Sequence, residues 1–169
     1  MAVSPSVGRT RVVPEPRRAW RIADRRHNLF DGGGARLLGG RWNSPGRAVI
    51  YAAQSYAGAL LEILVHAAIG RVPETMAWIE ILIPYTVGAE TIALDALPRW
   101  DAEDQRASRG FGDAWLTSGR SAVLLVPSLV TGGVEQNVLI NPAHPDFAAI
   151  TASRPAAVRW DRRLFRSGR

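Results

Sequence analysis

The stretch AVIYAAQSYAGALLEILVH, residues 48–66, decides the fold because it changes from a strand pattern to a helix pattern within a few residues. Residues 48–53 form a continuous apolar run of strand length, which is typical of a buried strand. Ser55 is the type of residue that begins a helix as its N-cap, and we expect a helix over residues 56–68. This helix is apolar nearly all round, a pattern typical of a buried helix. A strand leading into a buried helix predicts a packed core.

Glu62 is the one acidic residue of the predicted helix. Burying an unpaired carboxylate is costly, so Glu62 must reach a cleft or a partner group. Helical spacing places Ala59 and His66 on the same stripe as Glu62, and the small Gly58 leaves further room beside the carboxylate. This arrangement predicts a pocket wall. An ion pair between Glu62 and His66, or between Glu62 and an arginine, is the alternative interpretation.

A glycine-rich segment, residues 24–40, follows a predicted strand at residues 19–23 and contains Arg36; Arg41 comes directly after it. Glycines allow backbone N–H groups to approach an anion closely, and an arginine can donate two hydrogen bonds to one phosphate. The spacing matches neither a P-loop nor a dinucleotide fingerprint. We interpret the segment as a candidate anion-binding loop, and a surface loop without a ligand is the alternative.

The second half of the chain is richer in strand patterns. Residues 77–84 alternate, with Ile79, Ile81 and Ile83 on one face, and residues 122–126 form a continuous apolar run. Further strands are expected at residues 91–94, 138–140 and 158–165, and helical segments at residues 101–118, with breaks at Gly110 and Gly112, and at residues 144–150. Strands and helices are intermixed without a repeat or a linker. The pattern predicts a single α+β domain with a mixed central sheet and flanking helices.

Composition sets further limits. The chain has 169 residues, of which 47% are hydrophobic and 21% charged, which is typical of one globular domain. The absence of cysteine excludes disulfides, thiolate metal sites and a cysteine nucleophile. No apolar run approaches the roughly 20 residues that span a bilayer, and residues 1–16 lack the apolar core of a secretory signal. We therefore expect a cytoplasmic protein with no membrane partner.

All 21 basic residues are arginines, and against 15 acidic residues they give a net charge of +6. This excess suggests an anionic partner such as a nucleotide, a nucleic acid or an acidic protein. A compositional bias that places arginine where other chains carry lysine is the alternative interpretation. The same two interpretations apply to the arginines at the C-terminal end, which are Arg159, Arg162, Arg163, Arg166 and Arg169.

Histidine and serine provide weaker candidates. His27, His66 and His144 have no metal-ligand spacing, so no metal site is predicted, but two histidines would support the acid–base chemistry of a ribonuclease. Ser128 follows the apolar run of residues 122–126, and the Gly-x-Ser-x-Gly motif of a nucleophilic serine is absent. By its position alone, Ser128 is a residue at the end of a strand.

Several segments, in their order along the chain, resemble the RES-domain family, the toxins of RES–Xre type II toxin–antitoxin systems. They are Trp20-Arg21, GGGARLLGGRWNSPG at 32–46, AVIYAAQSYAGALLEILVH at 48–66, VPS at 126–128, QNVLINPAHPDF at 136–147 and WDRRLF at 160–165. Residues 87–119 match no segment of the family. We expect a flexible arm at residues 1–16, a RES-type domain at residues 17–166 and a basic tail at residues 167–169.

The resemblance implies a fold like that of ADP-ribosyltransferases and an activity that degrades NAD. The expected reaction cleaves the nicotinamide–ribose bond, with water or phosphate as the acceptor, so NAD is a substrate and no cofactor is expected. A protein ADP-ribosyltransferase with the same site is the alternative, and an RNA-binding module or ribonuclease is a weaker one. The expected partner is a helix-turn-helix, Xre-type antitoxin in a higher-order complex, through which alone the toxin would meet DNA.

The resemblance also implies roles for individual residues. Glu62, Arg21 and Ser128 are the expected catalytic residues, with Glu62 stabilising a ribose that has oxocarbenium character. Ser118 and Ser121 compete with Ser128 for the serine position. Arg41 and Arg36 are the expected substrate-binding residues on the glycine-rich segment, and Tyr51 is expected to stack on the nicotinamide ring.

Overall fold

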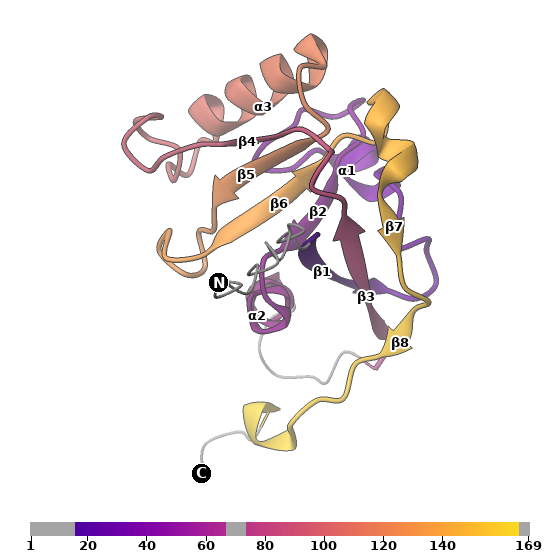
Figure 1. The fold of residues 1–169 in the computed structure, drawn as a ribbon. Coiled ribbons are helices and arrows are strands. Elements are labelled where there is room, and N and C mark those ends of the chain that lie inside the picture. Colours follow the sequence, from indigo (N-terminus) through magenta and orange to yellow (C-terminus); the bar gives the residue numbers. More distant parts are fainter. Residues whose placement is uncertain (1–15, 67–73, 166–169) are drawn as a thin grey trace, which may run out of the picture.

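The computed structural model describes residues 16–66 and 74–165, and within them the strands form one eight-stranded sheet (Figure 1). The sheet order is β4-β5-β6-β2-β1-β3-β7, and β8 also pairs with β3. Only the pairing of β4 with β5 is parallel among these strands. The predicted single α+β domain with a mixed sheet is confirmed.

Along the chain, the elements are β1 Arg17–Asp24, α1 Gly33–Leu38, β2 Ile50–Ala53, α2 Tyr56–His66, β3 Met76–Ile83, β4 Ala89–Thr91, α3 Arg106–Ser118, β5 Val123–Pro127, β6 Gln136–Ile140, the 3₁₀ helix η1 Pro145–Ala149, β7 Thr151–Ala152, β8 Ala156–Ala157 and the 3₁₀ helix η2 Arg162–Phe165. None of the helices in the described ranges is long and apolar enough to cross a membrane.

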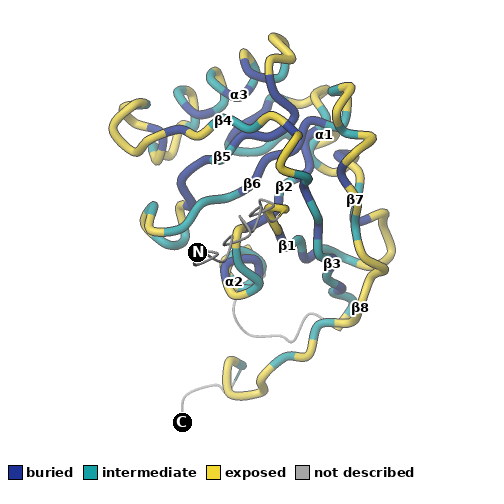
Figure 2. The backbone as a smooth tube through the Cα atoms, viewed as in Figure 1, coloured by how far each residue is buried: buried dark blue, intermediate teal, exposed yellow. Residues whose placement is uncertain are grey.

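The core lies on both faces of the central strands, which are the most deeply buried part of the molecule (Figure 2). The alternation predicted for β3 is confirmed, because Ile79, Ile81 and Ile83 are buried and their neighbours are less so. On the other side, Trp115 of α3 packs with Leu124 of β5. Helix α3 therefore covers the end of the sheet that β4 and β5 form.

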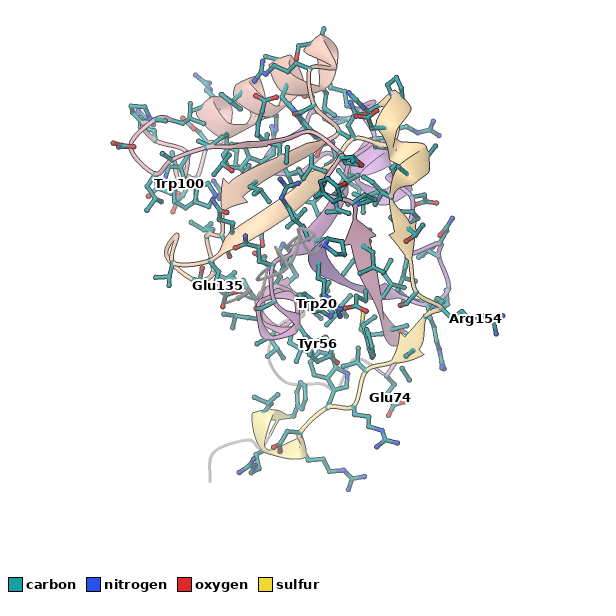
Figure 3. The ribbon with its side chains drawn as sticks, in the orientation of Figure 1. Trp20, Tyr56, Glu74, Trp100, Glu135 and Arg154 are labelled. Carbon is teal, nitrogen blue, oxygen red and sulfur yellow. The ribbon has the colours of Figure 1, made fainter. Side chains whose placement is uncertain are left out.

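Helix α2 packs against β1 and β2 and forms a third, smaller apolar cluster. Tyr56 meets Trp78 of β3 edge-on, with ring centroids 5.5 Å apart, and Trp20 belongs to the same cluster (Figure 3). The expectation that α2 is buried is wrong, since only Gly58 and Ala59 are buried in it. Helix α2 is apolar nearly all round, but the sheet covers only one side of it, so apolar side chains on its other side face outward.

Three further predictions differ from the structure. The strand predicted at residues 91–94 lies earlier in the chain, because β4 ends at Thr91. Helix α3 continues through Gly110 and Gly112, so neither glycine breaks it. Gly112 instead allows the helix to approach the backbone of Trp42, because a Cβ there would overlap the Trp42 carbonyl oxygen. The predicted strand at residues 158–165 is wrong. Asp161 instead accepts a hydrogen bond from the Arg163 backbone N–H at 2.9 Å, which starts the helical turn η2.

Some expectations concern residues outside the described ranges. The predicted arm at residues 1–16 is described only at its last residue, and the predicted tail at residues 167–169 is not described. The last two residues of the predicted helix, 67 and 68, also lie outside these ranges. The domain boundaries therefore stay predictions.

Candidate active site

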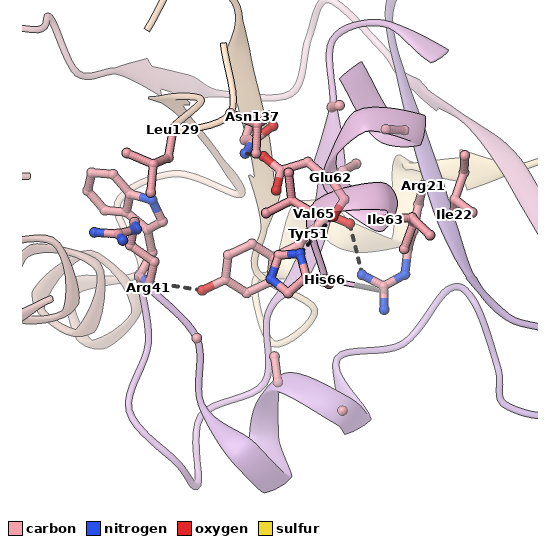
Figure 4. A pocket seen from close by; sticks show the side chains of 18 of the residues that line it. Arg21, Ile22, Arg41, Tyr51, Glu62, Ile63, Val65, His66, Leu129 and Asn137 are labelled. Carbon is pink, nitrogen blue, oxygen red and sulfur yellow. Dashed lines mark hydrogen bonds between the residues drawn. The ribbon is translucent and has the colours of Figure 1, made fainter. Parts of the chain in front are cut away.

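A cleft of about 760 Å³ opens between α1, α2 and α3 above the middle of the sheet (Figure 4). Its walls come from distant parts of the chain. Its charged and polar lining includes Arg21 of β1, Arg41, Tyr51 of β2, Glu62 of α2, Arg109 of α3 and Asn137 of β6. Five secondary-structure elements and one loop thus supply polar groups to one concave site, as in ligand-binding pockets generally.

The start of α2 fixes where Glu62 points. The Gly58 backbone N–H donates to Ser55 Oγ at 2.9 Å, which confirms the predicted N-cap. Ser55 Oγ in turn donates to Glu135 Oε2 at 2.7 Å, and this bond ties the helix start to the chain just before β6. Glu62 follows one turn after Gly58 and therefore faces the same strand.

The Glu62 carboxylate is held through one oxygen. Asn137 Nδ2 donates to Glu62 Oε1 at 2.7 Å, and Ser128 Oγ donates to the same oxygen at 3.3 Å. Among the described residues, no donor contacts the other oxygen, Oε2, and Glu62 has no ion-pair partner. His66 bonds the Glu62 backbone carbonyl oxygen, at 2.7 Å, and not the carboxylate. The structure thus excludes both ion-pair interpretations within its described ranges.

Arg21 lies on β1 and reaches under the cleft. Its Nη1 donates to the Tyr51 carbonyl oxygen at 2.8 Å, and its Nε is buried without a hydrogen-bond partner in the described part of the chain. Burial lowers the pKa of Arg21, and the negative charge of Asp31 acts in the opposite direction. A buried donor left unpaired is costly, so Arg21 is suited to an anionic ligand that enters the cleft.

Tyr51 connects the glycine-rich segment to the sheet. Its hydroxyl accepts a hydrogen bond from the Trp42 backbone N–H at 3.0 Å and donates to Asn43 Oδ1 at 2.7 Å. Burial raises the pKa of Tyr51 far above its usual value, so the hydroxyl stays protonated. Its ring lies in the cleft between Arg41 and Arg21 (Figure 4). The predicted stacking on nicotinamide stays a prediction.

The two arginines of the glycine-rich segment have different positions. Arg41 lines the cleft, and its Nη1 donates to the carbonyl oxygens of Trp100 at 3.1 Å and Ala102 at 2.9 Å. Arg36 is exposed near the end of α1 and does not belong to the cleft lining. The structure therefore does not bring Arg36 to the site, because the short helix α1 turns its side chain outward.

Of the three candidate serines, the structure brings Ser128 to Glu62. Ser128 is buried, and its hydroxyl contacts the carboxylate. Ser118 Oγ donates to the Trp115 carbonyl oxygen at 2.9 Å, and Ser121 Oγ donates to Glu90 Oε1 at 2.6 Å. Ser118 therefore bonds the last turn of α3 and Ser121 bonds β4, and neither lines the cleft.

Three polar residues of the cleft were not predicted. Asn137 follows the polar Glu135 and Gln136 at the start of β6, before the apolar residues 138–140, so no sequence pattern marks it out. Gln105 and Arg109 come from residues 87–119, where nothing in the sequence indicates a site. Of the three histidines, only His66 contributes to the cleft lining. His144 Nδ1 instead accepts a hydrogen bond from the Asp146 backbone N–H at the start of η1.

The fold and cleft define a small α+β protein with one clamped carboxylate in an arginine-lined site. The RES domain family model matches residues 18–161, and the chain belongs to the RES domain family. It is 44% identical to the "Prs ADP-ribosylating toxin" of Sphingobium sp. (strain YBL2) over 87% of this chain and 96% of that protein. It is 38% identical to "Toxin Res" of Pseudomonas putida (strain KT2440) over 75% of this chain and 85% of that protein.

A solved structure shares the fold. The M. tuberculosis MbcT–MbcA toxin–antitoxin complex contains a chain that matches with a TM-score of 0.63 and 18% identity, covering 85% of each chain. The expected α+β fold of a toxin in this family is thereby confirmed. With the family match, these relatives identify the chain as a toxin of a toxin–antitoxin system.

Proposed function

We propose that this toxin cleaves the bond between nicotinamide and ribose in NAD. The observation that carries the proposal is the Glu62 carboxylate, whose Oε1 is held by Asn137 and Ser128 while Oε2 receives no hydrogen bond from the described residues. A fixed carboxylate with one free oxygen at a cleft wall can oppose a positive charge that develops on a ligand.

The chemistry needs few groups. Nicotinamide in NAD is a cationic leaving group, so it departs as a neutral ring with the electrons of the broken bond and requires no strong acid. The ribose is left with oxocarbenium character, which Glu62 stabilises through its charge. Arg21 and Arg41 bind the phosphates, since both line the cleft and neither has an ion-pair partner in the described ranges. An acceptor oxygen or nitrogen then bonds to the ribose carbon and loses a proton.

The first candidate acceptor is water or phosphate, because the cleft opens to solvent beside Glu62. The second candidate is a protein side chain. This alternative is supported by the 44% identity with a toxin whose name states that it ADP-ribosylates Prs. Prs from the organism that carries this toxin is therefore the protein acceptor to test first.

The experiment separates these acceptors by their products. The protein is incubated with NAD alone, with phosphate or with Prs, and the products are identified by mass spectrometry. Water gives ADP-ribose, phosphate gives a phosphorylated ADP-ribose, and a protein acceptor gives Prs carrying one ADP-ribosyl group. Glu62→Gln keeps the size of the side chain and should lower turnover about 10²–10³-fold, whereas the exposed Glu103→Gln should leave it unchanged. Near-normal turnover by a folded Glu62→Gln protein would contradict the proposal.

We further propose a cytoplasmic toxin held by an Xre-type helix-turn-helix antitoxin in a larger complex. The fold shared with the toxin–antitoxin complex supports such a partner. In this proposal the toxin meets DNA only through the antitoxin. A ribonuclease is less well supported, because of the three histidines only His66 reaches the cleft.

A further inference from the structure

We infer that Arg109 of α3 binds a phosphate group of the dinucleotide and that Gln105 positions it for this contact. The inference rests on the proposed function, which assigns NAD as substrate but gives α3 no role. It concerns the part of the chain, residues 87–119, in which the sequence indicates no site.

The Arg109 guanidinium is fixed on two sides. Its Nη2 donates to Gln105 Oε1 at 2.7 Å, and its Nε donates to the Gly40 carbonyl oxygen at 3.3 Å. Both Arg109 and Gln105 line the cleft. Within residues 16–66 and 74–165, Nη1 has no hydrogen-bond partner and Arg109 has no ion pair. The guanidinium is therefore oriented by neutral groups and keeps its charge free for a ligand.

Gln105 holds its position in an unfavourable backbone conformation. Its φ of 56° lies in the left-handed region, which residues with a Cβ rarely adopt. The conformation occurs where the chain enters α3, and it brings the Gln105 side chain onto Arg109. Strain of this kind is retained where the surrounding structure needs the resulting geometry. Here the geometry produced is an aligned arginine at the cleft wall.

Arg109 lies at the end of the cleft that is away from the Glu62 carboxylate. Tyr51 divides the cleft: Arg21 lies on the side of Glu62, and Arg41 lies on the side of the Tyr51 hydroxyl (Figure 4). Arg109 contacts Gly40, the residue before Arg41, and so belongs to the second side. A dinucleotide with its ribose beside Glu62 extends its phosphates along the cleft. Arg41 and Arg109 together then form a cationic end that matches this charge.

The test measures NAD binding by calorimetry in the Glu62→Gln protein, in which NAD cleavage is slowed about 10²–10³-fold. Arg109→Ala should weaken NAD binding about 10- to 100-fold, because a charge-assisted hydrogen bond to phosphate is lost. Arg106→Ala, an exposed neighbour on the same helix, should change it less than about twofold. Inorganic pyrophosphate should compete with NAD, and its competition should weaken in Arg109→Ala but not in Arg106→Ala.

Gln105→Ala should also weaken NAD binding, and the double substitution with Arg109→Ala should be no weaker than Arg109→Ala alone. This non-additivity distinguishes a positioning role from general destabilisation, which thermal unfolding of each variant checks. Equal NAD affinity in Arg109→Ala and Arg106→Ala overturns the inference, as does pyrophosphate competition that is absent or equal in both. If neither the Glu62→Gln protein nor the protein without any substitution binds NAD, the proposed function itself fails.

Discussion

Two donors, the Asn137 amide and the Ser128 hydroxyl, converge on the same oxygen of Glu62. Each donor fixes the rotation of the carboxylate, and together they present Oε2 to the cleft. The shorter bond comes from Asn137, so the amide provides most of the alignment. The site depends on the orientation of the Glu62 carboxylate, because a carboxylate on a half-exposed helix would otherwise adopt several rotamers.

We expect Asn137→Ala to lower kcat about 10- to 100-fold while the NAD affinity changes only a few-fold, since a hydrogen bond to a charged group contributes roughly 1.5–3 kcal/mol. Steady-state kinetics with an independent binding measurement provides the separation. Asn137→Asp should be worse than Asn137→Ala, because it places a second carboxylate against Glu62. A loss confined to KM would assign Asn137 to binding and contradict the positioning role.

Arg21 supports a second prediction at the residue scale. Arg21→Ala should weaken NAD binding about 10- to 100-fold, because it removes a buried guanidinium with an unpaired Nε beneath the cleft. Arg25 is four residues later and exposed, and Arg25→Ala makes the same change in net charge. Isothermal titration of both variants is the measurement. Equal effects would show that net charge, and not the cleft, governs the affinity.

At the scale of elements, α3 and the loop that carries Arg41 form one unit. Ser44 donates to Asp113 of α3 through its backbone N–H at 2.9 Å and through its hydroxyl at 2.6 Å. Gly112 lies against the Trp42 backbone, which leaves no space for a side chain. The position of the arginine-bearing loop is therefore set by a helix whose sequence gave no indication of such a role.

The two glycines of α3 should respond oppositely to alanine. Gly112→Ala should destabilise the protein by about 2 kcal/mol or more, because the new methyl group overlaps the Trp42 carbonyl and the helix must move. Gly110→Ala has open space and should stabilise the protein by about 0.5–1 kcal/mol through a better helix propensity. Urea unfolding gives both free energies. Equal changes in the two variants would contradict the close packing of α3 on the loop.

The sequence predicted elements well where the pattern was local. The alternation of β3 and the Ser55 cap of α2 are confirmed, since each depends on neighbours within a few residues. The strand predicted for residues 158–165 is wrong, because a side-chain bond from Asp161 favours a turn there. Glu62 could be singled out as the one acid of an apolar helix. Its donors depend on the register between β2, β5 and β6, which no local pattern reveals.

For the whole molecule, the cleft combines a cationic floor with an apolar rim. Leu38, Val65 and Leu129 line its mouth and are 79%, 58% and 44% exposed. Large exposed aliphatic side chains that gather at one place on a surface are suited to contact another protein. The arginines below the rim match an anionic group on such a partner.

We therefore predict that the antitoxin inhibits by occupying the cleft with an acidic group near Arg21 or Arg41. NAD should then compete with the antitoxin, so the apparent affinity of the antitoxin should fall as the NAD concentration rises. Titration of activity at several NAD concentrations measures this. One source of the acidic group is the antitoxin's own C-terminal carboxylate, and removal of the last residues of the antitoxin should then abolish the competition. Full inhibition by the truncated antitoxin, with no effect of NAD, would instead indicate distortion of the toxin.

The position of β6 in the sheet also determines when, during synthesis of the chain, the Glu62 site is completed. Ser128 and Asn137 follow Glu62 by 66 and 75 positions along the chain, and β6 must pair with β2 before the carboxylate is clamped. A chain emerging from the ribosome thus carries Glu62 long before its donors. Under the proposed function, chains that stop before β6 lack the Asn137 donor that orients Glu62 and should not cleave NAD, so activity appears only after β6 has been synthesised and paired with β2.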